Sequence, residues 1–331
     1  MKRKRKAAKK TRKAVLILLF LFLLGGAAAA SWMKNDYDRA REESLRQIEE
    51  SGGSLENAGD IEFNSPVDDL DYINVLLVGL DREDGSSRTD TIMLAQYRPN
   101  EDKARLVSLM RDAYVSIPGY RDNKLNTAYF LGGLELLRQT LKENFDIDVH
   151  YYAQVDFDGF VRVVDTLAPS GVEVDVEKRM YYDGGGSLVI DFQPGPQIMD
   201  GEDALKYVRF RNDYENDFGR VRRQQEMLSI LKNELLSLSG VRRIPQVLGS
   251  IEPYIQTNIS TQKLLSYGSD FFLSGIDEIE TLTIPVDGSY VDATYPHAGA
   301  VLELDLEENK QALHDFLEID SPSSLTSHGS E

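Results

Sequence analysis

The chain of 331 residues contains no cysteine, so disulfide bonds, thiolate metal sites and a cysteine nucleophile are excluded. It also has no GxxxxGKS/T nucleotide-binding loop, no HExxH zinc motif and no GxSxG serine-nucleophile turn. Its four histidines are scattered and unsuited to a metal cluster: His150, His297, His314 and His328. Thiol, zinc and serine-nucleophile chemistry of these kinds is therefore not expected.

Basic residues are scarce outside the first 13 positions. Those 13 residues hold nine Lys or Arg side chains and no acid, whereas the net charge of the whole chain is −18. Removing the nine positive charges leaves −27 on the rest, which argues against a nucleic-acid partner because phosphate neutralisation needs a basic face. Hydrophobic residues at 41% and charged residues at 28% are typical of a globular protein.

The basic segment at residues 1–13, called the basic head below, is followed by one long apolar run. Residues Ala14 to Met33 carry no charge over 20 positions, and about 20 apolar residues cross a bilayer core. We therefore expect a transmembrane helix at 14–33, with residues 1–13 cytoplasmic and the rest extracellular by the positive-inside rule. A cleaved signal peptide is the alternative, because the strongly apolar part, Val15–Leu24, is short and small residues follow it.

The exported part divides into three segments. Residues 34–71 are polar and acidic and are expected to form a stalk with one exposed helix at Arg39–Glu50, and residues 321–331 are expected to be a disordered tail. Between them, strand and helix signals alternate over residues 72–320, which predicts an α/β sandwich with helices on both faces of the sheet. The predicted strands are Tyr72–Leu80, Thr91–Tyr97, Arg105–Met110, Tyr151–Val155, Gly171–Val176 and Glu280–Pro285, and the predicted helices are Gly132–Phe145, Phe157–Leu167, Gly201–Tyr207, Gly219–Leu238 and Glu307–Leu317.

Two carboxylates lie at the ends of two predicted strands that are consecutive in the sequence. Asp81 follows the first strand, and Asp90 immediately precedes the second. They can converge on one hard cation, since Mg²⁺ takes one or two carboxylates and fills its shell with water and substrate phosphate. Ordinary turn chemistry is the alternative, because Asp is common in loops. Past the third strand, Arg111 and Asp112 are most simply interpreted as a surface ion pair.

A stretch of only 15 residues in this acidic domain contains five arginines: Arg209, Arg211, Arg220, Arg222 and Arg223. If Val208–Arg211 is extended, Arg209 and Arg211 share one face. On the predicted helix from Gly219, Arg220 and Gln224 lie at or inside the apolar stripe, and Arg222 points the opposite way. Because a helix N-terminus and Arg both favour phosphate, this pattern indicates an inward anion site. A solvated charge run accounts for Arg222 and Arg223 only.

Six ordered segments closely resemble the LytR-CpsA-Psr family: NVLLVGLDRE…SSRTDTIML, SLMRDAYVSIPGY, KLNTAYFLGG, YYAQVDFDGFVRVVDTL, GEDALKYVRFR and DFGRVRRQQ. The resemblance runs from about Ile73 to Leu317. Two positions depart from the family pattern. Leu80 replaces the usual hydroxyl residue before Asp81, and Met110 replaces the usual proline before Arg111.

The resemblance implies a three-layer α/β/α sandwich with a central mixed sheet, preceded by one transmembrane helix, that houses a polyprenyl chain in an apolar tunnel. It implies a phosphotransferase that depends on Mg²⁺, or alternatively Mn²⁺. Such enzymes move an anionic glycopolymer, of teichoic acid or capsule type, from an undecaprenyl-diphosphate carrier to peptidoglycan. The implied location is the cell membrane of a Gram-positive-type bacterium, with residues 72–320 as an extracellular catalytic domain.

The family motifs also imply roles for single residues. Asp81 and Asp90 are the implied metal ligands. The implied pyrophosphate-binding residues are Arg88, Arg111, Lys124, Arg209, Arg211, Arg220 and Gln224. Asp90, Arg111 and Arg220 are the implied catalytic residues, with Asp90 or Asp112 assisting deprotonation. We also expect the helices at Leu134–Phe145 and Phe157–Leu167 to line the lipid site, with ordinary core as the alternative.

Two other functions use the same sequence features. A polyprenyl-diphosphate pyrophosphatase would take water as the acceptor with the same residues. A non-catalytic membrane regulator that binds lipid is disfavoured, because such a protein does not need Arg, Gln and Asp side chains that point inward at one site. The basic head is also too short for a DNA-binding domain, which disfavours a direct transcription factor.

Overall fold

The computed structural model describes residues 31–50, 61–66, 71–81, 88–184, 189–237, 244–276 and 278–319, with Arg88 and Phe272 described by their backbone alone. The predicted head at 1–13, most of the predicted membrane segment and the predicted tail at 321–331 lie outside these ranges. Within them, no helix combines the length and the apolar character needed to span a bilayer.

A six-stranded sheet forms the centre of the molecule, in the order β11-β6-β1-β2-β3-β12. β1 runs antiparallel to β2 and parallel to β6, and β12 runs parallel to β3, so the sheet is mixed. Alternate residues of β1 are buried, because successive side chains of a strand point to opposite faces. The strands are β1 (Ile73–Asp81), β2 (Arg88–Arg98), β3 (Lys103–Leu109), β6 (Tyr151–Asp156), β11 (Gln256–Thr257) and β12 (Glu280–Ile284).

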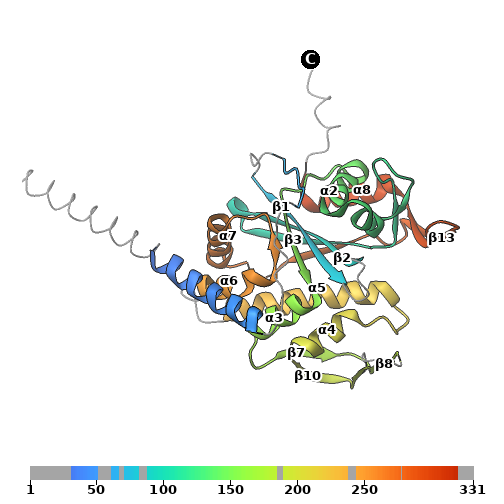
Figure 1. Ribbon diagram of the computed structural model, residues 1–331. Helices are drawn as coiled ribbons and strands as arrows, with labels where there is room; N and C mark the ends of the chain where they lie inside the picture. The colour runs from blue at the N-terminus through green and yellow to red at the C-terminus, as the bar shows by residue number, and fades with distance from the viewer. Residues whose placement is uncertain are drawn as a thin grey trace, which may run out of the picture.

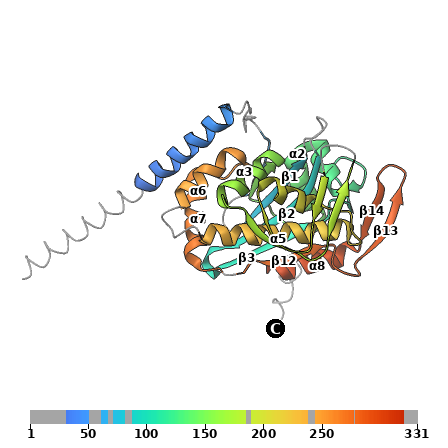
Figure 2. The same ribbon diagram turned by 90° about the horizontal axis from the view of Figure 1, so that it is seen from below.

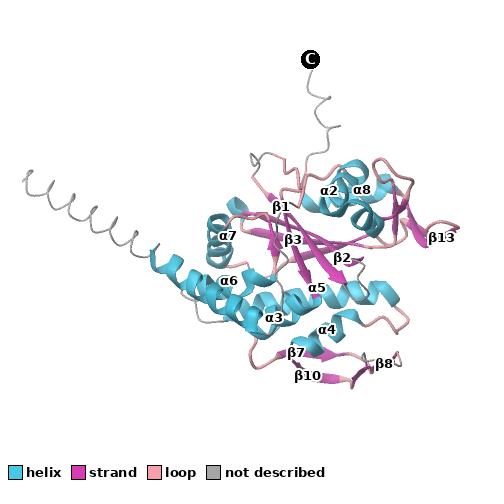
Figure 3. Ribbon diagram, in the orientation of Figure 1, coloured by secondary structure: helices cyan, strands magenta, loops and turns pink. Residues whose placement is uncertain are grey.

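Helices cover both faces of this sheet, which confirms the predicted three-layer sandwich (Figures 1 and 3). α2 (Leu125–Phe145) and α8 (Leu306–Leu317) lie on one face, and α3 (Phe157–Leu167) and α5 (Asn216–Ser237) lie on the other. The largest apolar core fills the space between the sheet and α2. α3 begins and ends where the sequence predicts, because the Asp156 side chain accepts the Gly159 N–H at the helix start.

A second sheet extends the fold beyond the third central strand, in the order β13-β14-β4-β5. β4 (Ala113–Val115) starts directly after Arg111 and Asp112, and it pairs with β5 (Asn123–Lys124) and with β14 (Gly299–Leu304). β13 (Tyr290–Tyr295) completes a hairpin with β14. The sequence analysis did not predict these short strands, because each is formed by pairing with a distant segment.

A second apolar core lies beyond α3 and α5, around α4 (Gly201–Arg209). Two small sheets close it, one of β7 (Val172–Val176) and β10 (Gly195–Met199), the other of β8 (Met180–Asp183) and β9 (Val189–Phe192). Strand β7 was predicted, whereas β8, β9 and β10 were not. The β8–β9 hairpin brings Tyr182 and Gly184 to the mouth of the cavity described below.

A helix over residues 31–50 docks against α6 (Ile244–Ile251), beside α7 (Thr261–Ser274) (Figure 2). Tyr37 is 2% exposed, and Ser44 Oγ donates to Ser250 O at 2.9 Å. The prediction of an exposed helix here is wrong, since one face of it is buried. Gly249 permits the docking, because a Cβ at that position would lie 2.3 Å from the Tyr37 carbonyl oxygen.

Candidate active site

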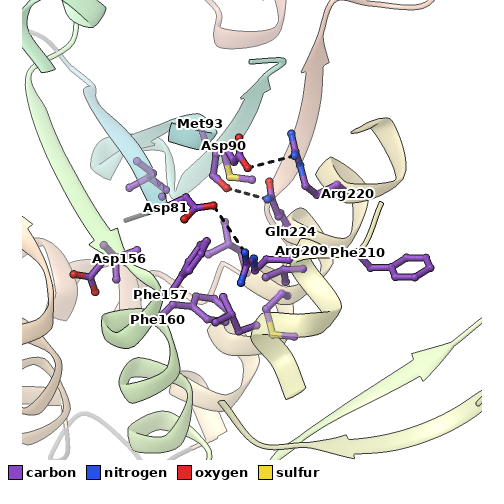
Figure 4. Close-up of a pocket in the computed structure, with 18 of the residues that line it drawn as sticks. Asp81, Asp90, Met93, Asp156, Phe157, Phe160, Arg209, Phe210, Arg220 and Gln224 are labelled. Atoms are coloured by element: carbon purple, nitrogen blue, oxygen red, sulfur yellow. Dashed lines mark hydrogen bonds and ion pairs between the residues drawn. The ribbon is translucent and has the colours of Figure 1, made fainter. Parts of the chain in front are cut away.

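A cavity of about 810 Å³ lies between the central sheet and the helices α3, α4 and α5 (Figure 4). Most of its wall is apolar. The residues that make this part come from β1, β2, α3 and α5, and include Leu77, Met93, Phe157, Phe160, Val163, Met227, Leu228 and Leu231. The wall also carries a polar group of side chains, Asp81, Asp90, Arg209, Arg211, Arg220 and Gln224.

One of the two helices predicted to line the lipid site does not contribute to the apolar wall. Phe157, Phe160 and Val163 of α3 line the cavity, as expected. The helix segment Leu134–Phe145 does not, because it belongs to α2 on the other face of the sheet, where Leu137 and Phe145 are fully buried in the main core. Its apolar spacing reflects ordinary core packing, which was the alternative interpretation.

The two carboxylates meet at this cavity, as the sequence predicts. Asp81 is the last residue of β1, and its backbone lies opposite that of Arg88, the first residue of β2. A register shift between Gly79 and Leu80 marks an irregularity just before Asp81. Asp90 follows two residues after Arg88, and both carboxylates line the cavity. Arg88 is therefore at the predicted strand mouth, although the structure describes only its backbone.

Arg209 and Arg211 approach the site from the end of α4. The Arg209 guanidinium lies 3.8 Å from the Asp81 carboxylate and 4.1 Å from the centre of the Phe157 ring. The prediction that Val208–Arg211 is extended is wrong for its first two residues, because α4 continues to Arg209. The helix continues because Ala204, Tyr207 and Val208 share its buried face. Arg209 and Arg211 nevertheless both line the cavity.

Arg220 and Gln224 project inward from α5, as predicted. Arg220 is 3% exposed, and its Nε and Nη1 have no hydrogen-bond partner among the described residues. Gln224 Nε2 donates to Thr91 Oγ1 at 2.9 Å. Arg222 points away, with its guanidinium 3.1 Å from both Glu177 and Glu215. The helix therefore presents one arginine to the cavity and another to its opposite side.

Arg223 corrects the interpretation of a solvated charge run. It is 3% exposed, and its guanidinium donates to Asp213 at 2.9 Å and to the Phe210 carbonyl at 2.6 Å. It anchors the segment between α4 and α5. The sequence analysis assigned this helix one buried face and one solvent-exposed face. That assignment is wrong for Arg223 because α5 is covered from two sides, by the sheet and by α4.

Arg111 links the cavity wall to a wider ionic network. It donates to Asp90, and it lies 3.3 Å from Asp112 and 3.3 Å from Asp217. Lys124 Nζ donates to Asp112 Oδ1 at 2.7 Å. Arg111 and Asp112 are thus members of a partly buried network and not a surface pair. Neither Arg111 nor Lys124 lies on the cavity wall itself.

Asp217 is a site residue that the sequence analysis missed. It lies in the first turn of α5, 3.3 Å from Arg220 and 3.9 Å from Arg211, as well as close to Arg111. Its position three residues before Arg220 was a usable signal, because such pairs are neighbours on a helix. The ion pairs among the described residues thus join four cations to three carboxylates, Arg111, Lys124, Arg211 and Arg220 with Asp90, Asp112 and Asp217, and Arg209 and Asp81 form a further ion pair at the cavity wall.

The pKa shifts follow from this packing. Burial opposes ionisation of Asp90, but Arg111 and Arg220 outweigh it and hold the pKa of Asp90 below its ordinary value. The pKa of Asp112 is also lowered, because Lys124 and Arg111 outweigh burial. Burial lowers the pKa of Arg220 to about 10, since Asp217 and Asp90 offset it only in part and Arg111 repels it. Arg220 is still charged at neutral pH, but it is incompletely neutralised.

Asp81 and Asp90 are also the residues that could hold a metal ion. Within the described ranges, no cluster of three or more His, Asp or Glu side chains is suited to a metal. Two carboxylates on one cavity wall nevertheless match the donor set of Mg²⁺, which completes its shell with water and phosphate oxygens. The donor chemistry therefore fits a cation that binds together with a phosphorylated ligand.

Comparison with known proteins identifies the relatives of this fold and site. The model of the LytR_cpsA_psr family matches residues 21–314. The chain belongs to the LytR-CpsA-Psr family. The regulatory protein MsrR of Staphylococcus aureus is 42% identical over 260 residues, which are 78% of each chain. A polyisoprenyl-teichoic acid–peptidoglycan teichoic acid transferase, TagU of Oceanobacillus iheyensis, is 31% identical over 71% of this chain and 73% of its own.

Solved structures of this family share the fold. TagV of B. subtilis aligns over 76% of this chain and 98% of its own, with a TM-score of 0.64 and 27% identity. TagT of B. subtilis, with bound octaprenyl pyrophosphate lipid, aligns over 78% of this chain and 95% of its own, with a TM-score of 0.57 and 29% identity. The resemblance inferred from the six sequence segments is therefore confirmed at the level of family and fold.

Proposed function

We propose that this protein is a membrane-anchored extracellular phosphotransferase that moves an anionic glycopolymer from an undecaprenyl-diphosphate carrier to peptidoglycan. The polymer is of teichoic acid or capsule type. The names of TagU, a teichoic acid transferase, and of TagT with its bound octaprenyl pyrophosphate support this assignment. The chain's own cavity supports it independently, because one side suits a lipid and the other suits a diphosphate.

One observation carries the proposal. Arg220 is buried at the polar end of an otherwise apolar cavity, and two of its nitrogens have no hydrogen-bond partner in the described part of the chain. Buried donors are almost always paired, because an unpaired one costs about 1–3 kcal/mol. A diphosphate bound beside Arg220 would supply acceptors for these nitrogens, and it would add negative charge to that of Asp217 and Asp90, which lie 3.3 and 3.9 Å from Nη1. The apolar wall would then hold the prenyl chain attached to it.

The reaction breaks one bond and forms one. A hydroxyl oxygen of the acceptor sugar attacks the glycan-side phosphorus, and the bond from that phosphorus to the bridging oxygen breaks. Polyprenyl phosphate leaves with the bridging oxygen and its electron pair, and the hydroxyl proton passes to a base. Arg211 and Arg220 hold phosphoryl oxygens and stabilise the charge that develops on them, and Arg111, next to the cavity wall, adds positive charge through its contact with Asp90. Asp112, a member of the ionic network around Arg111, is the proposed proton acceptor.

Mg²⁺, or alternatively Mn²⁺, completes the proposed site. Asp81 and Asp90 would hold it at the cavity wall. Bound there, the cation would neutralise charge on the diphosphate oxygens and help the polyprenyl phosphate to leave. The protein's own contribution at Asp90 is to keep that carboxylate ionised, because the neighbouring arginines hold its pKa below the ordinary value.

The proposed location follows from the sequence. Residues 14–33 would cross the membrane and leave the catalytic domain on the extracellular side, where peptidoglycan lies. The helix described over residues 31–50 includes the last residues of this segment and docks on α6. This arrangement would hold the cavity close to the membrane that contains the lipid carrier.

The test uses the full chain in detergent with a synthetic polyprenyl-diphosphate-linked glycan and Mg²⁺. Release of polyprenyl phosphate is measured with and without isolated peptidoglycan. We expect release that depends on peptidoglycan. Equal release in both reactions would instead identify a pyrophosphatase. Tight binding of the donor without release in either reaction would indicate a non-catalytic lipid-binding regulator.

A further inference from the structure

The second sheet carries a cluster of aromatic rings that the proposed donor site does not use. Tyr114 of β4 and Tyr295 of β13 stack face to face, with ring centroids 4.6 Å apart and planes 14° apart. His297 joins them, 6.3 Å from the Tyr114 ring and 5.8 Å from the Tyr295 ring. These three rings are only partly buried. The three residues are called the aromatic platform below.

The aromatic platform lies on the face of the sheet that points away from the main core. Ala113 and Val115 of β4 are buried in that core, so Tyr114 between them points outward. Lys124 pairs directly with Tyr114 across β4 and β5, so both side chains share this face. The Tyr295 hydroxyl bonds to Glu303 of β14, which pairs with Tyr114 in register. Stacked rings thus lie among polar groups.

The platform is continuous with the ionic network of the active site. Lys124 donates to Asp112, Asp112 contacts Arg111, and Arg111 donates to Asp90 on the cavity wall. A chain of contacts therefore leads from the cavity wall through Arg111, Asp112 and Lys124 to the aromatic platform. In phosphoryl transfer, the attacking and leaving oxygens lie roughly in line. If the leaving polyprenyl phosphate occupies the cavity, the attacking hydroxyl enters from the opposite side, which is the side of the platform.

The position of the platform in the whole molecule agrees with this direction. β13 and β14 lie at the end of the molecule opposite the helix at 31–50 (Figures 1 and 2). That helix leads back to the predicted membrane segment. The platform is thus at the end farthest from the proposed anchor, where a polymer outside the membrane can reach it.

We propose that the aromatic platform binds the acceptor glycan and holds its hydroxyl toward the diphosphate. This inference rests on the proposed transferase function. The C–H faces of pyranose rings are apolar and stack on aromatic rings, whereas hydroxyl and N-acetyl groups at their edges need polar partners. Tyr114, Tyr295 and His297 supply the rings. Lys124 and Glu303 supply polar partners at the edge of the platform.

The test is a calorimetric titration of the full chain in detergent. The ligand is an unsubstituted tetrasaccharide of alternating N-acetylglucosamine and N-acetylmuramic acid. We expect Tyr295→Ala to weaken this binding roughly 3- to 10-fold, the loss expected for one stacked ring. Tyr295→Phe keeps the ring and should bind like the wild type. Binding of a polyprenyl-diphosphate-linked glycan should stay within about twofold in both variants, because Tyr295 is outside the donor cavity.

Tyr181→Ala is the matched control, because Tyr181 is an exposed tyrosine of β8 in a different sheet. Equal effects of Tyr181→Ala and Tyr295→Ala, or no tetrasaccharide binding by the wild type, would overturn the platform. Preferential binding of a glycerol phosphate polymer in place of the tetrasaccharide would also overturn it. The proposed function fails separately, if the wild-type protein releases no polyprenyl phosphate when donor and whole peptidoglycan are supplied.

Discussion

Arg220 differs from Arg111 in the balance between burial and neighbouring charge. Arg111 has three carboxylates around it, and they raise its pKa above the ordinary value despite burial. Arg220 is more deeply buried, and burial lowers its pKa to about 10 because Asp217 and Asp90, at 3.3 and 3.9 Å, offset the burial only in part. Arg220 is thus a buried cation at the cavity wall, where a diphosphate would bind, and the nearby carboxylates compensate its burial only in part.

Replacing Arg220 should separate ligand binding from stability. Arg220→Ala should weaken turnover of the donor roughly 10- to 100-fold, because one charge-assisted contact is worth about 1.5–3 kcal/mol. The melting temperature should barely fall, since an incompletely paired buried cation is removed. Both are measured by polyprenyl phosphate release and thermal melts. Arg222→Ala is the control on the opposite side of α5, and equal losses in the two variants would contradict an inward anion site.

The carboxylates should act through the metal. Asp90→Asn and Asp81→Asn should each reduce Mg²⁺ affinity and turnover together by at least about tenfold, a loss seen even when outer-shell partners of a metal are removed. Metal titration and turnover are measured on the same samples. Asp191→Asn, at an exposed ion pair with Arg179, serves as the control. Unchanged metal affinity in both site variants would leave Asp81 and Asp90 as turn formers.

The lowered pKa values of Asp90 and Asp112 predict how stability depends on pH. A carboxylate with a depressed pKa in the folded state stabilises the fold above its unfolded pKa of about 4, and this contribution is lost as pH falls through the lower folded value. We therefore expect these two residues to cause no loss of stability between pH 8 and pH 5, and a loss below about pH 4. In chemical unfolding, Asp112→Asn should be less stable at pH 7 and lose less between pH 5 and pH 3. An unchanged pH dependence would contradict the ionic network.

At the scale of elements, the helix α5 assembles much of the site. Its first turns carry Asp217, Arg220 and Gln224, and its middle carries Met227 and Leu231 of the apolar wall. One helix thus spans from the phosphate-binding end of the cavity to the lipid-binding end. Its apolar periodicity was readable from the sequence, which is why Arg220 and Gln224 were correctly predicted to point inward.

Other elements could not be predicted in this way. β4, β13 and β14 are short strands whose partners lie far away in sequence, so no local period marks them. The aromatic platform was invisible for the same reason, since Tyr114 and Tyr295 meet only through that pairing. Arg223 was misread because α5 is buried on two sides. The sequence thus predicted the central strands and amphipathic helices, whereas contacts made by tertiary pairing came from the structure.

The docked helix at 31–50 allows a test at this scale. Gly249→Ala should destabilise the domain by about 1–3 kcal/mol, the usual cost of overpacking, because its Cβ would collide with the Tyr37 carbonyl oxygen. Thermal and chemical unfolding measure this. Gly268→Ala in α7 is the control, since its Cβ would meet only the end of the Leu248 side chain at 3.1 Å. In a chain truncated before residue 61, Gly249→Ala should no longer be destabilising, and an undiminished effect there would contradict the docking.

At the scale of the whole molecule, the account requires a fixed orientation. The acidic body carries −27 once the basic head is removed, and the domain is proposed to lie outside the membrane. A protease added to intact protoplasts should therefore digest the chain after Lys34 and spare the first 13 residues. The measurement is an immunoblot with tags at both ends, and protoplasts lysed before treatment are the control. Protection of the whole chain would overturn the extracellular location.

The most direct test of the central claim follows the glycan-side phosphorus. A donor labelled with ³²P at that position is incubated with the full chain, Mg²⁺ and isolated peptidoglycan. The account predicts that the label becomes covalently attached to peptidoglycan, with one unlabelled polyprenyl phosphate released for each label transferred. Recovery of the label as soluble glycan phosphate, in the same amount with and without peptidoglycan, would contradict it.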